Sequence, residues 1–228
     1  MSKQISVELV DHMGSDLSAV NAARVSYGAE SKTLTERDSH LLSFLAEHEH
    51  VTPFRHAQVT LRCRAPIFLA RQLGKHQVGF SWNEVSRRYK DGEAIKIECY
   101  QPEMVFARPD KLMTQTATLM DPDFADDVKH ILATVHATAI REYKHLIGIG
   151  VAPEQARMVL PQSMITEWIW TGSLYGWASM YVQRSTPHAQ YEARVFAEEV
   201  SKVMSELFPI CWKELTKSAK ERLEELNK

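Results

Sequence analysis

Strict alternation of apolar and polar side chains marks one predicted strand. Val59, Leu61, Cys63 and Ala65 alternate with glutamine, threonine and two arginines. Because successive side chains of a strand point to opposite faces, one face of this strand is expected to be buried. The other face is expected to meet water or a ligand.

Helical and strand signals follow one another unevenly along the rest of the chain. Pro66 begins a short predicted helix that ends at Gly74, and apolar residues at helical spacing predict a long helix from Phe124 to Leu146. The other predicted elements are a helix over 16–27, a helix after a capping box of Thr35 and Asp38, alternation over Ile95, Ile97 and Cys99, a short helix over 153–161, a strand over 164–170 with Thr166, Trp168 and Trp170 on one face, and a helix over 187–208. Without regular βα alternation, these elements indicate an α+β fold, in which helices flank a central antiparallel sheet in a single domain over residues 1–228.

Composition is that of an ordinary globular chain. The 228 residues are 44% hydrophobic and 25% charged, and 27 basic against 29 acidic side chains give a formal net charge of −2. This balance argues against a general nucleic-acid coat. No apolar stretch reaches the length of a membrane span, and no signal peptide is readable. Three widely spaced cysteines without a CxxC pair suit a reducing compartment, so we expect the cytoplasm of a cell or of an infected host.

Positive charge is concentrated in one window. Residues 55–91 hold eight basic side chains against two acidic ones. A solvated face can hold such an excess, but here the arginines are interleaved with apolar strand and helix positions. Arginine forks beside a serine hydroxyl, as in the segment from Ser81 to Tyr89, fit the oxygens of a phosphate monoester. The window therefore predicts a nucleotide site.

Several segments of the chain together resemble the flavin-dependent thymidylate synthases. They are Thr52-Pro53-Phe54-x-His56, Ala65-Pro66-Ile67-Phe68, Ala70-Arg71-Gln72-Leu73-Gly74-Lys75-His76-Gln77, Asn83-Glu84-x-Ser86-x-Arg88-Tyr89, Ala156-Arg157-Met158-Val159-Leu160-Pro161 and Arg184 followed by His188-Ala189-Gln190. The similarity is collinear from about Val7 to Phe208. Where the family usually has Arg-His-Arg, this chain has Lys75-His76-Gln77 with one extra residue before Asn83. Lysine is a point charge and arginine a rigid fork, so the flavin contacts are expected to differ in detail.

The resemblance implies a homotetramer with active sites at subunit junctions, FAD as cofactor, and dUMP, methylenetetrahydrofolate and NADPH as small-molecule partners. The reaction it implies is reductive methylation of dUMP to dTMP. The implied dUMP contacts are Gln72, Lys75, Glu84, Ser86, Arg87, Arg88, Arg157 and Arg184. The implied flavin and folate contacts are Ser26, His56, Gln58, Lys75, His76, Gln77, Ser173, Tyr175, Ser179 and His188.

Arg184 and His56 are the implied catalytic residues. Arg184 matches the arginine that the family uses to favour ionisation of uracil N3, and a fixed cation stabilises the anion formed there. Unlike the unrelated thymidylate synthases, such enzymes use no cysteine nucleophile. Cys63 shares the apolar face of its strand, so it is expected to be buried and inert.

Structural roles compete with several of these assignments. His56 can pack beside Phe54, Arg157 can pair with Glu154 on a helix, and Ser86 can cap a helix. Trp168, Trp170 and Trp177 are interpreted as core or interface aromatic residues and not as a cofactor site. The run from His48 to His50 has no HExxH spacing, so no metal site is predicted.

Three rival functions differ in what a purified protein would do. A related pyrimidine nucleotide hydroxymethylase would add a hydroxymethyl group in place of a methyl group. A non-catalytic nucleotide or RNA binder would carry no flavin, and its affinity would fall steeply with salt. A histidine-rich metal phosphohydrolase would lose its activity with a chelator.

Overall fold

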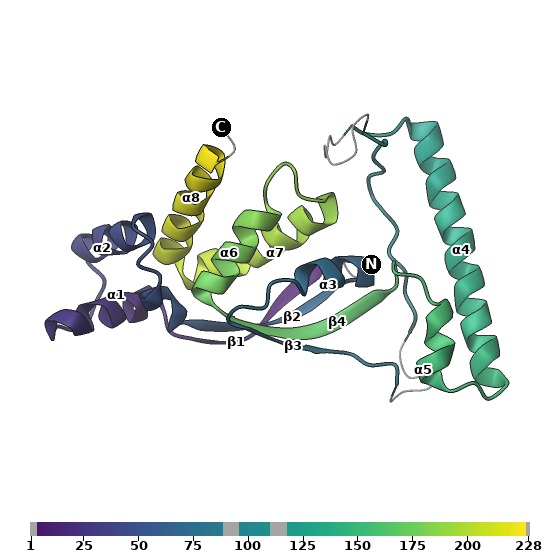
Figure 1. Ribbon diagram of the computed structural model, residues 1–228, viewed down its shortest axis with the longest axis horizontal. Helices are drawn as coiled ribbons and strands as arrows, with labels where there is room; N and C mark the ends of the chain where they lie inside the picture. The colour runs from purple at the N-terminus through teal and green to yellow at the C-terminus, as the bar shows by residue number, and fades with distance from the viewer. Residues whose placement is uncertain (1–3, 89–95, 110–117, 227–228) are drawn as a thin grey trace. The chain divides into compact units, whose positions relative to one another are not determined.

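The fold is described from a computed structural model, which covers residues 4–88, 96–109 and 118–226. Four strands form an antiparallel sheet in the order β1-β2-β4-β3, and eight α-helices occur in these ranges (Figure 1). The predicted α+β class with an antiparallel sheet is confirmed. No helix of the described ranges is both long enough and apolar enough to cross a membrane.

The chain is divided into two compact units. The first unit contains residues 1–5, 64–73 and 84–168, and the second contains residues 6–63, 74–83 and 169–228. Each unit is assembled from segments that are far apart in sequence. The single domain over residues 1–228 stays a prediction.

The sequence predicted the two central strands but neither edge strand. β2 (Gln58–Pro66) and β4 (Ile165–Ser173) follow the expected alternation, with Trp168 and Trp170 buried as core residues. β1 (Ser6–Met13) has no buried residue, and β3 (Phe80–Glu84) has five residues and none buried. Because an edge strand covers little of the core, its side chains carry a weak periodic signal.

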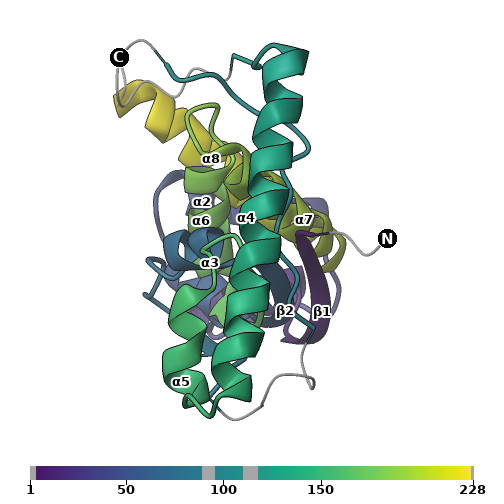
Figure 2. The same cartoon turned by 90° about the vertical axis from the view of Figure 1, so that its right-hand side faces the viewer.

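The first unit contains the predicted long helix and its short companion. α4 (Pro122–Gly148) is followed by α5 (Pro153–Ala156) and a 3₁₀ turn, η3 (Arg157–Val159), in agreement with the predictions. α5 lies beside the C-terminal part of α4 (Figures 1 and 2). α3 (Ile67–Leu73) is the short helix expected after Pro66. The alternation predicted up to Cys99 yields an isolated bridge between Cys99 and Met164, and Ile95 lies outside the described residues.

The second unit contains the remaining helices. They are α1 (Asp16–Arg24) with the 3₁₀ turn η1 (Val25–Tyr27), α2 (Glu36–Glu47), the 3₁₀ turn η2 (Thr52–Arg55), α6 (Leu174–Arg184), α7 (Tyr191–Leu207) and α8 (Pro209–Leu226). The predicted capping box of Thr35 and Asp38 begins α2. The helix predicted from Pro187 begins at Tyr191, because Thr186 to Ala189 form a hydrogen-bonded turn. α8 begins at Pro209 and was not predicted from the sequence.

Aromatic rings fill the core of the second unit. The ring of Phe80 lies 4.7 Å from that of Trp170 and 5.0 Å from that of Trp177, measured between centroids. Phe80 packs against the backbone of Gly172, where an added Cβ atom would overlap the ring. Trp177, fully buried as predicted, donates from its indole nitrogen to the Val59 carbonyl. This packing fixes β3 beside the start of α6.

Candidate functional site

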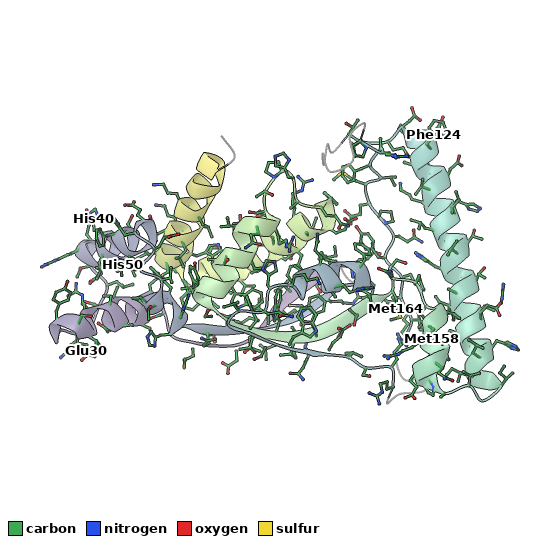
Figure 3. All side chains as sticks on the ribbon, in the orientation of Figure 1. Glu30, His40, His50, Phe124, Met158 and Met164 are labelled. Atoms are coloured by element: carbon green, nitrogen blue, oxygen red, sulfur yellow. The ribbon has the colours of Figure 1, made fainter. Side chains whose placement is uncertain are left out.

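Four predicted nucleotide contacts line one cavity of the first unit. Glu84, Ser86, Arg87 and Arg157 reach it from the end of β3, the residues after it and η3. Its volume is about 930 Å³. The other lining residues are Arg64, Ile67, Val85, Lys96, Glu98, Met158, Leu160, Met164, Ile165, Thr166 and Glu167. Met158 and Met164, two apolar residues of this lining, are labelled in Figure 3.

Ion pairs organise the charged side of this cavity. Arg64, from the polar face of β2, pairs with Glu98 and lies 3.5 Å from Glu167. Lys96 donates to the other oxygen of Glu98 at 2.9 Å. The Lys96 hydrogen bond, with the cations of Arg64 and Lys96, lowers the pKa of Glu98. The Glu98 carboxylate is therefore held ionised beside cations, and Arg87 and Arg157 are the further cations of the cavity.

Local hydrogen bonds orient two side chains that are predicted to contact the nucleotide, those of Glu84 and Ser86. The Thr166 hydroxyl on β4 donates to Glu84 Oε1 at 2.7 Å. Ser86 Oγ accepts from the backbone N–H of Arg88 at 3.3 Å, so this serine forms a local turn and also lines the cavity. Ser86 therefore caps a turn and, within the described residues, not the helix that was considered for it, while its side chain lies among the residues that line the cavity.

Arg157 does not form the ion pair with Glu154 that was considered as its alternative, structural role. Its Nε donates to the Glu154 backbone carbonyl at 3.3 Å, while the Glu154 carboxylate lies 3.6 Å from Arg88 Nε. Arg88 is half-exposed and is not part of the cavity lining. Gln72, on α3, has a buried Oε1 that accepts no hydrogen bond from the described residues.

The second unit holds another cavity, of about 570 Å³, formed by most of the predicted flavin contacts. Two segments that are far apart in the sequence line this cavity. One contains Lys75, His76 and Gln77, and the other is α6 with its N-cap. The lining residues are Arg55, Lys75, His76, Gln77, Val78, Gly79, Phe80, Ser173, Tyr175, Gly176, Ser179, Gln183 and Arg184. Three are cations, and no carboxylate of the described chain lines it. The cavity therefore favours an anionic ligand.

Arg184, at the end of α6, makes a direct hydrogen bond to His76. Its Nε donates to His76 Nε2 at 3.0 Å. Because the guanidinium has no acceptor, this imidazole nitrogen must carry the lone pair. Burial, and then the nearby Arg184 cation, lower the pKa of His76 to about 4. Burial also lowers the pKa of Arg184. The pair is therefore a neutral histidine holding a charged arginine.

Two further contacts shape this cavity. Ser173 Oγ accepts from Gly176 N at 3.1 Å, so it caps α6 while lining the cavity. The Arg55 guanidinium lies over the Tyr175 ring, 5.3 Å from the centroid. In the sequence, Arg55 is one of the basic residues of the window over 55–91. Its cation is now a component of the predicted flavin site.

Four predicted cofactor residues lie outside both cavity linings. His56 is exposed although Phe54 is fully buried, and Gln58 donates to the Arg55 carbonyl at 2.8 Å. Ser26 and His188 are exposed. Their predicted roles stay predictions. Tyr89, Lys90 and Asp91 of the basic window lie outside the described residues.

Sequence reasoning missed part of the first cavity. The sequence carries no signal that marks Lys96, Glu98 or Glu167 as site residues, because a charged residue on a strand or loop cannot be told from any other surface residue. Arg64 had one, since it lies on the polar face of the alternating strand. Only the fold brings these residues of separate segments together.

The three cysteine thiols are free. Cys63 is fully buried as expected, and burial raises its pKa well above the ordinary value. Burial also raises the pKa of Cys99 and Cys211. Neither described cavity is lined by a cysteine, and no three His, Cys, Asp or Glu side chains gather for a metal within the ranges described.

Known proteins are similar to this chain over most of its length. The family model described as thymidylate synthase complementing protein matches residues 8–210. The flavin-dependent thymidylate synthase of Kosmotoga olearia is 39% identical over 208 residues, which are 90% of this chain and 87% of that protein. The corresponding Thermus thermophilus enzyme is 38% identical, over 90% and 73% of the two chains.

A solved structure shares the fold. The UMP/dUMP methylase PolB from Streptomyces cacaoi, bound with 5-Br dUMP, superimposes with a TM-score of 0.85 at 30% identity. The match covers 95% of this chain and 96% of that one. Sequence and fold agree, and the chain belongs to the family of flavin-dependent thymidylate synthases.

Proposed function

We propose that this protein converts dUMP to dTMP with methylenetetrahydrofolate as one-carbon donor, FAD as cofactor and NADPH as reductant. Family membership supports the reaction class. The observation that carries the assignment to this chain is the cavity of the second unit, where the predicted flavin contacts and Arg184 meet around three cations.

The residues of this cavity fit the chemistry of FAD. Lys75 and Arg55 supply positive charge for a pyrophosphate, while Gln77 and Ser179 supply hydrogen-bonding groups. Tyr175 adds an aromatic face. We propose that these side chains hold FAD, which when bound accepts hydride from NADPH and supplies it to the one-carbon unit. Lys75 would offer a single charge where the family has an arginine fork.

The cavity of the first unit fits a nucleoside monophosphate. Arg87 and Arg157 are cations suited to a phosphate, and the Ser86 hydroxyl can donate to it. Gln72 Oε1, a buried acceptor without a described donor, does not line this cavity, so the nucleotide contact implied for Gln72 stays a prediction. The same arginines favour a charged nucleotide over an uncharged nucleoside, which has no phosphate for their guanidinium groups to bind.

Arg184, which lines the cavity of the second unit, is proposed to stabilise negative charge on the uracil ring at an active site that the family resemblance places between subunits. A guanidinium favours the ring form ionised at N3, which raises electron density at C5, where the new carbon bond forms. His76 holds this guanidinium through the 3.0 Å hydrogen bond. Because its pKa is lowered to about 4, His76 accepts this bond throughout the neutral range.

Three further parts of the proposal are a reaction without a cysteine nucleophile, the assembly of subunits and the location of the protein in the cell. Buried thiols with raised pKa values are poor nucleophiles, which supports a reaction without a cysteine adduct. A homotetramer with active sites at subunit interfaces follows from the family resemblance. The cytoplasmic location stays a prediction from cysteine usage.

The test is whether purified protein binds flavin and whether NADPH reduces it. We expect a yellow protein whose flavin absorbance is bleached anaerobically by NADPH. In a double variant with Lys75→Ala and Arg55→Ala, flavin occupancy should fall at least about tenfold, because two cations are lost. The matched control Lys32→Ala plus Arg37→Ala removes two exposed cations of the same unit outside the cavity and should keep full occupancy. A colourless protein that cannot be loaded with FAD would contradict the proposal.

The alternative function is a nucleotide hydroxymethylase, which differs from the proposed enzyme in the nucleotide that it produces. PolB is described as acting on both UMP and dUMP, so both nucleotides belong in the assay. The relatives are enzymes by name, which disfavours the non-catalytic binder.

A further inference from the structure

Thr166 is a polar residue on a buried, aromatic face of β4. Because every second side chain of a strand points to the same face, Thr166 shares this face with Trp168 and Trp170. Thr166 is 8% exposed, against 2% and 0% for the two tryptophans. A buried hydroxyl costs free energy unless it is hydrogen-bonded, whereas a valine of the same shape would carry no such cost. A threonine at this position therefore points to a partner for its hydroxyl group.

The partner of this hydroxyl is the carboxylate of Glu84, at the end of β3. Thr166 Oγ1 donates to Glu84 Oε1 at 2.7 Å. The backbone keeps the two residues together, because Val85 N donates to the Glu167 carbonyl at 2.9 Å, one residue further along in each segment. Thr166 and Glu84 both line the cavity of the first unit. The hydrogen bond therefore fixes the position of a carboxylate at the cavity wall.

Glu84 lies beside the proposed phosphate contacts in the chain. Ser86 and Arg87 follow it after a single intervening residue, and both line the same cavity. In a nucleoside 5′-monophosphate the sugar is joined directly to the phosphate. A side chain next to the phosphate contacts is therefore placed to meet the sugar.

The chemistry of a carboxylate limits the part of dUMP that Glu84 can contact. An ionised carboxylate only accepts hydrogen bonds. At neutral pH the phosphate of dUMP is mostly doubly ionised, so the donors of the nucleotide are the N3–H of uracil and the 3′-hydroxyl of the sugar. A carboxylate beside N3 would oppose the ring ionisation that the proposed reaction needs, because like charges repel. The 3′-hydroxyl is therefore the donor that suits Glu84.

We propose that Thr166 is a positioning residue, which holds Glu84 so that its carboxylate accepts a hydrogen bond from the 3′-hydroxyl of the nucleotide sugar. The inference rests on the proposed function, in which dUMP occupies the cavity of the first unit. It adds the group that recognises the sugar and the residue that orients this group. Without the Thr166 hydroxyl, the long Glu84 side chain samples other rotamers, and its contact with the sugar is weakened.

Two nucleotides that differ only in the 3′-hydroxyl test this role. Isothermal titration calorimetry gives the dissociation constants of dUMP and of 2′,3′-dideoxyuridine monophosphate for protein loaded with FAD. The original protein should bind dUMP about tenfold more tightly or better, because a charge-assisted hydrogen bond is gained. Thr166→Val keeps the shape of the side chain and removes its hydroxyl. It should weaken dUMP binding so that the ratio of the two constants falls toward one, with the dideoxynucleotide unaffected.

Three further variants separate the hydroxyl from its surroundings. Thr166→Ser keeps the hydroxyl and should keep the original ratio. Thr171→Val is the matched control, because Thr171 is another hydrogen-bonded threonine of β4, 2.9 Å from Thr60 Oγ1, and does not line the cavity; it should leave both constants unchanged. In a Glu84→Ala background, Thr166→Val should weaken dUMP binding no further, because the two side chains act as a unit.

Steady-state kinetics distinguish positioning from a general loss of structure. Thr166→Val should raise KM for dUMP about tenfold and change kcat by less than about twofold, because the sugar contact is the same in the ground state and the transition state. Circular dichroism shows that each variant is folded.

The inference is overturned if the original protein binds the two nucleotides alike. It is also overturned if folded Thr166→Val weakens both nucleotides equally or weakens neither. A protein that gives one of these results and still forms dTMP leaves the proposed function standing. A protein that binds neither nucleotide contradicts both.

Discussion

His76 shows how its surroundings set the charge of one residue. Burial and the Arg184 cation lower its pKa to about 4, whereas the ordinary value is 6.5. Between these values the unfolded chain binds more protons than the folded one, so the free energy of unfolding should fall as the pH decreases through this window. Above it, the contribution is fully present.

Urea unfolding at a series of pH values measures this effect. The fall between pH 6.5 and 4 should be smaller in His76→Gln than in the original protein. His40→Gln, at an exposed histidine of α2, serves as the control and should keep the original dependence. Equal pH dependence in His76→Gln and the original protein would mean that His76 is not held neutral.

Arg184 is the residue on which the proposed chemistry depends most. Arg184→Ala should lower turnover of dUMP by about 10² to 10³, because a fixed charge at the developing anion is lost. Arg184 is not fully buried, so the fold should be retained, as thermal unfolding would show. Arg37→Ala, at an exposed position, should be fully active. Near-normal turnover in Arg184→Ala would assign the arginine a structural role instead.

Cys63 illustrates a residue whose burial argues against chemistry. Cys63→Ala, and the triple variant that also replaces Cys99 and Cys211, should retain turnover within about an order of magnitude, because no thiol lines either described cavity. Steady-state rates of the folded variants measure this. Complete loss of activity in folded Cys63→Ala would show a cysteine step.

At the scale of elements, the start of α2 is held by a buried carboxylate. Asp38 is 1% exposed, accepts from Thr35 Oγ1 at 2.7 Å and from Thr35 N at 2.9 Å, and pairs with Arg24. The Thr35 hydroxyl bond, helped by the Arg24 cation, lowers the pKa of Asp38. The stabilisation is therefore present above the ordinary pKa and is lost as the pH falls through the lowered one.

Asp38→Asn should reduce the free energy of unfolding at neutral pH by about 1.5 to 3 kcal/mol, since charge-assisted hydrogen bonds are lost. Glu36→Gln changes an exposed carboxylate in the same turn and should shift it by less than about 0.5 kcal/mol. Denaturant titrations compare the two. An Asp38→Asn protein as stable as the control would show that the capping box is dispensable.

Strands whose side chains are buried were predicted from the sequence better than strands whose side chains are exposed. β2 and β4 were read from alternation because their side chains pack on a core, whereas the weakly buried edge strands β1 and β3 were missed. The capping box gave the start of α2 because it is a local interaction. The start of α7 was misplaced by four residues, since Pro187 belongs to a turn that the next helix follows.

Across the whole molecule, the sequence indicated candidate site residues better than it indicated which of them line the same cavity. The resemblance named Ser86, Arg157 and Arg184, yet the first two line one cavity and the third lines another. Arg55 and Arg64 line these cavities together with residues of distant segments, and no local pattern encodes that grouping. The near-neutral chain thus gathers cations at both cavities, although three carboxylates, of Glu84, Glu98 and Glu167, also line the first.

The product formed from dUMP tests the central claim most directly. Protein loaded with FAD is incubated with dUMP, methylenetetrahydrofolate and NADPH, and the nucleotide is analysed by mass spectrometry, with reactions lacking NADPH and with Arg184→Ala as controls. We expect a methyl group on the uracil ring, formed only when NADPH and Arg184 are present. A hydroxymethylated nucleotide, or unchanged dUMP with a fully loaded enzyme, would contradict the proposed reaction.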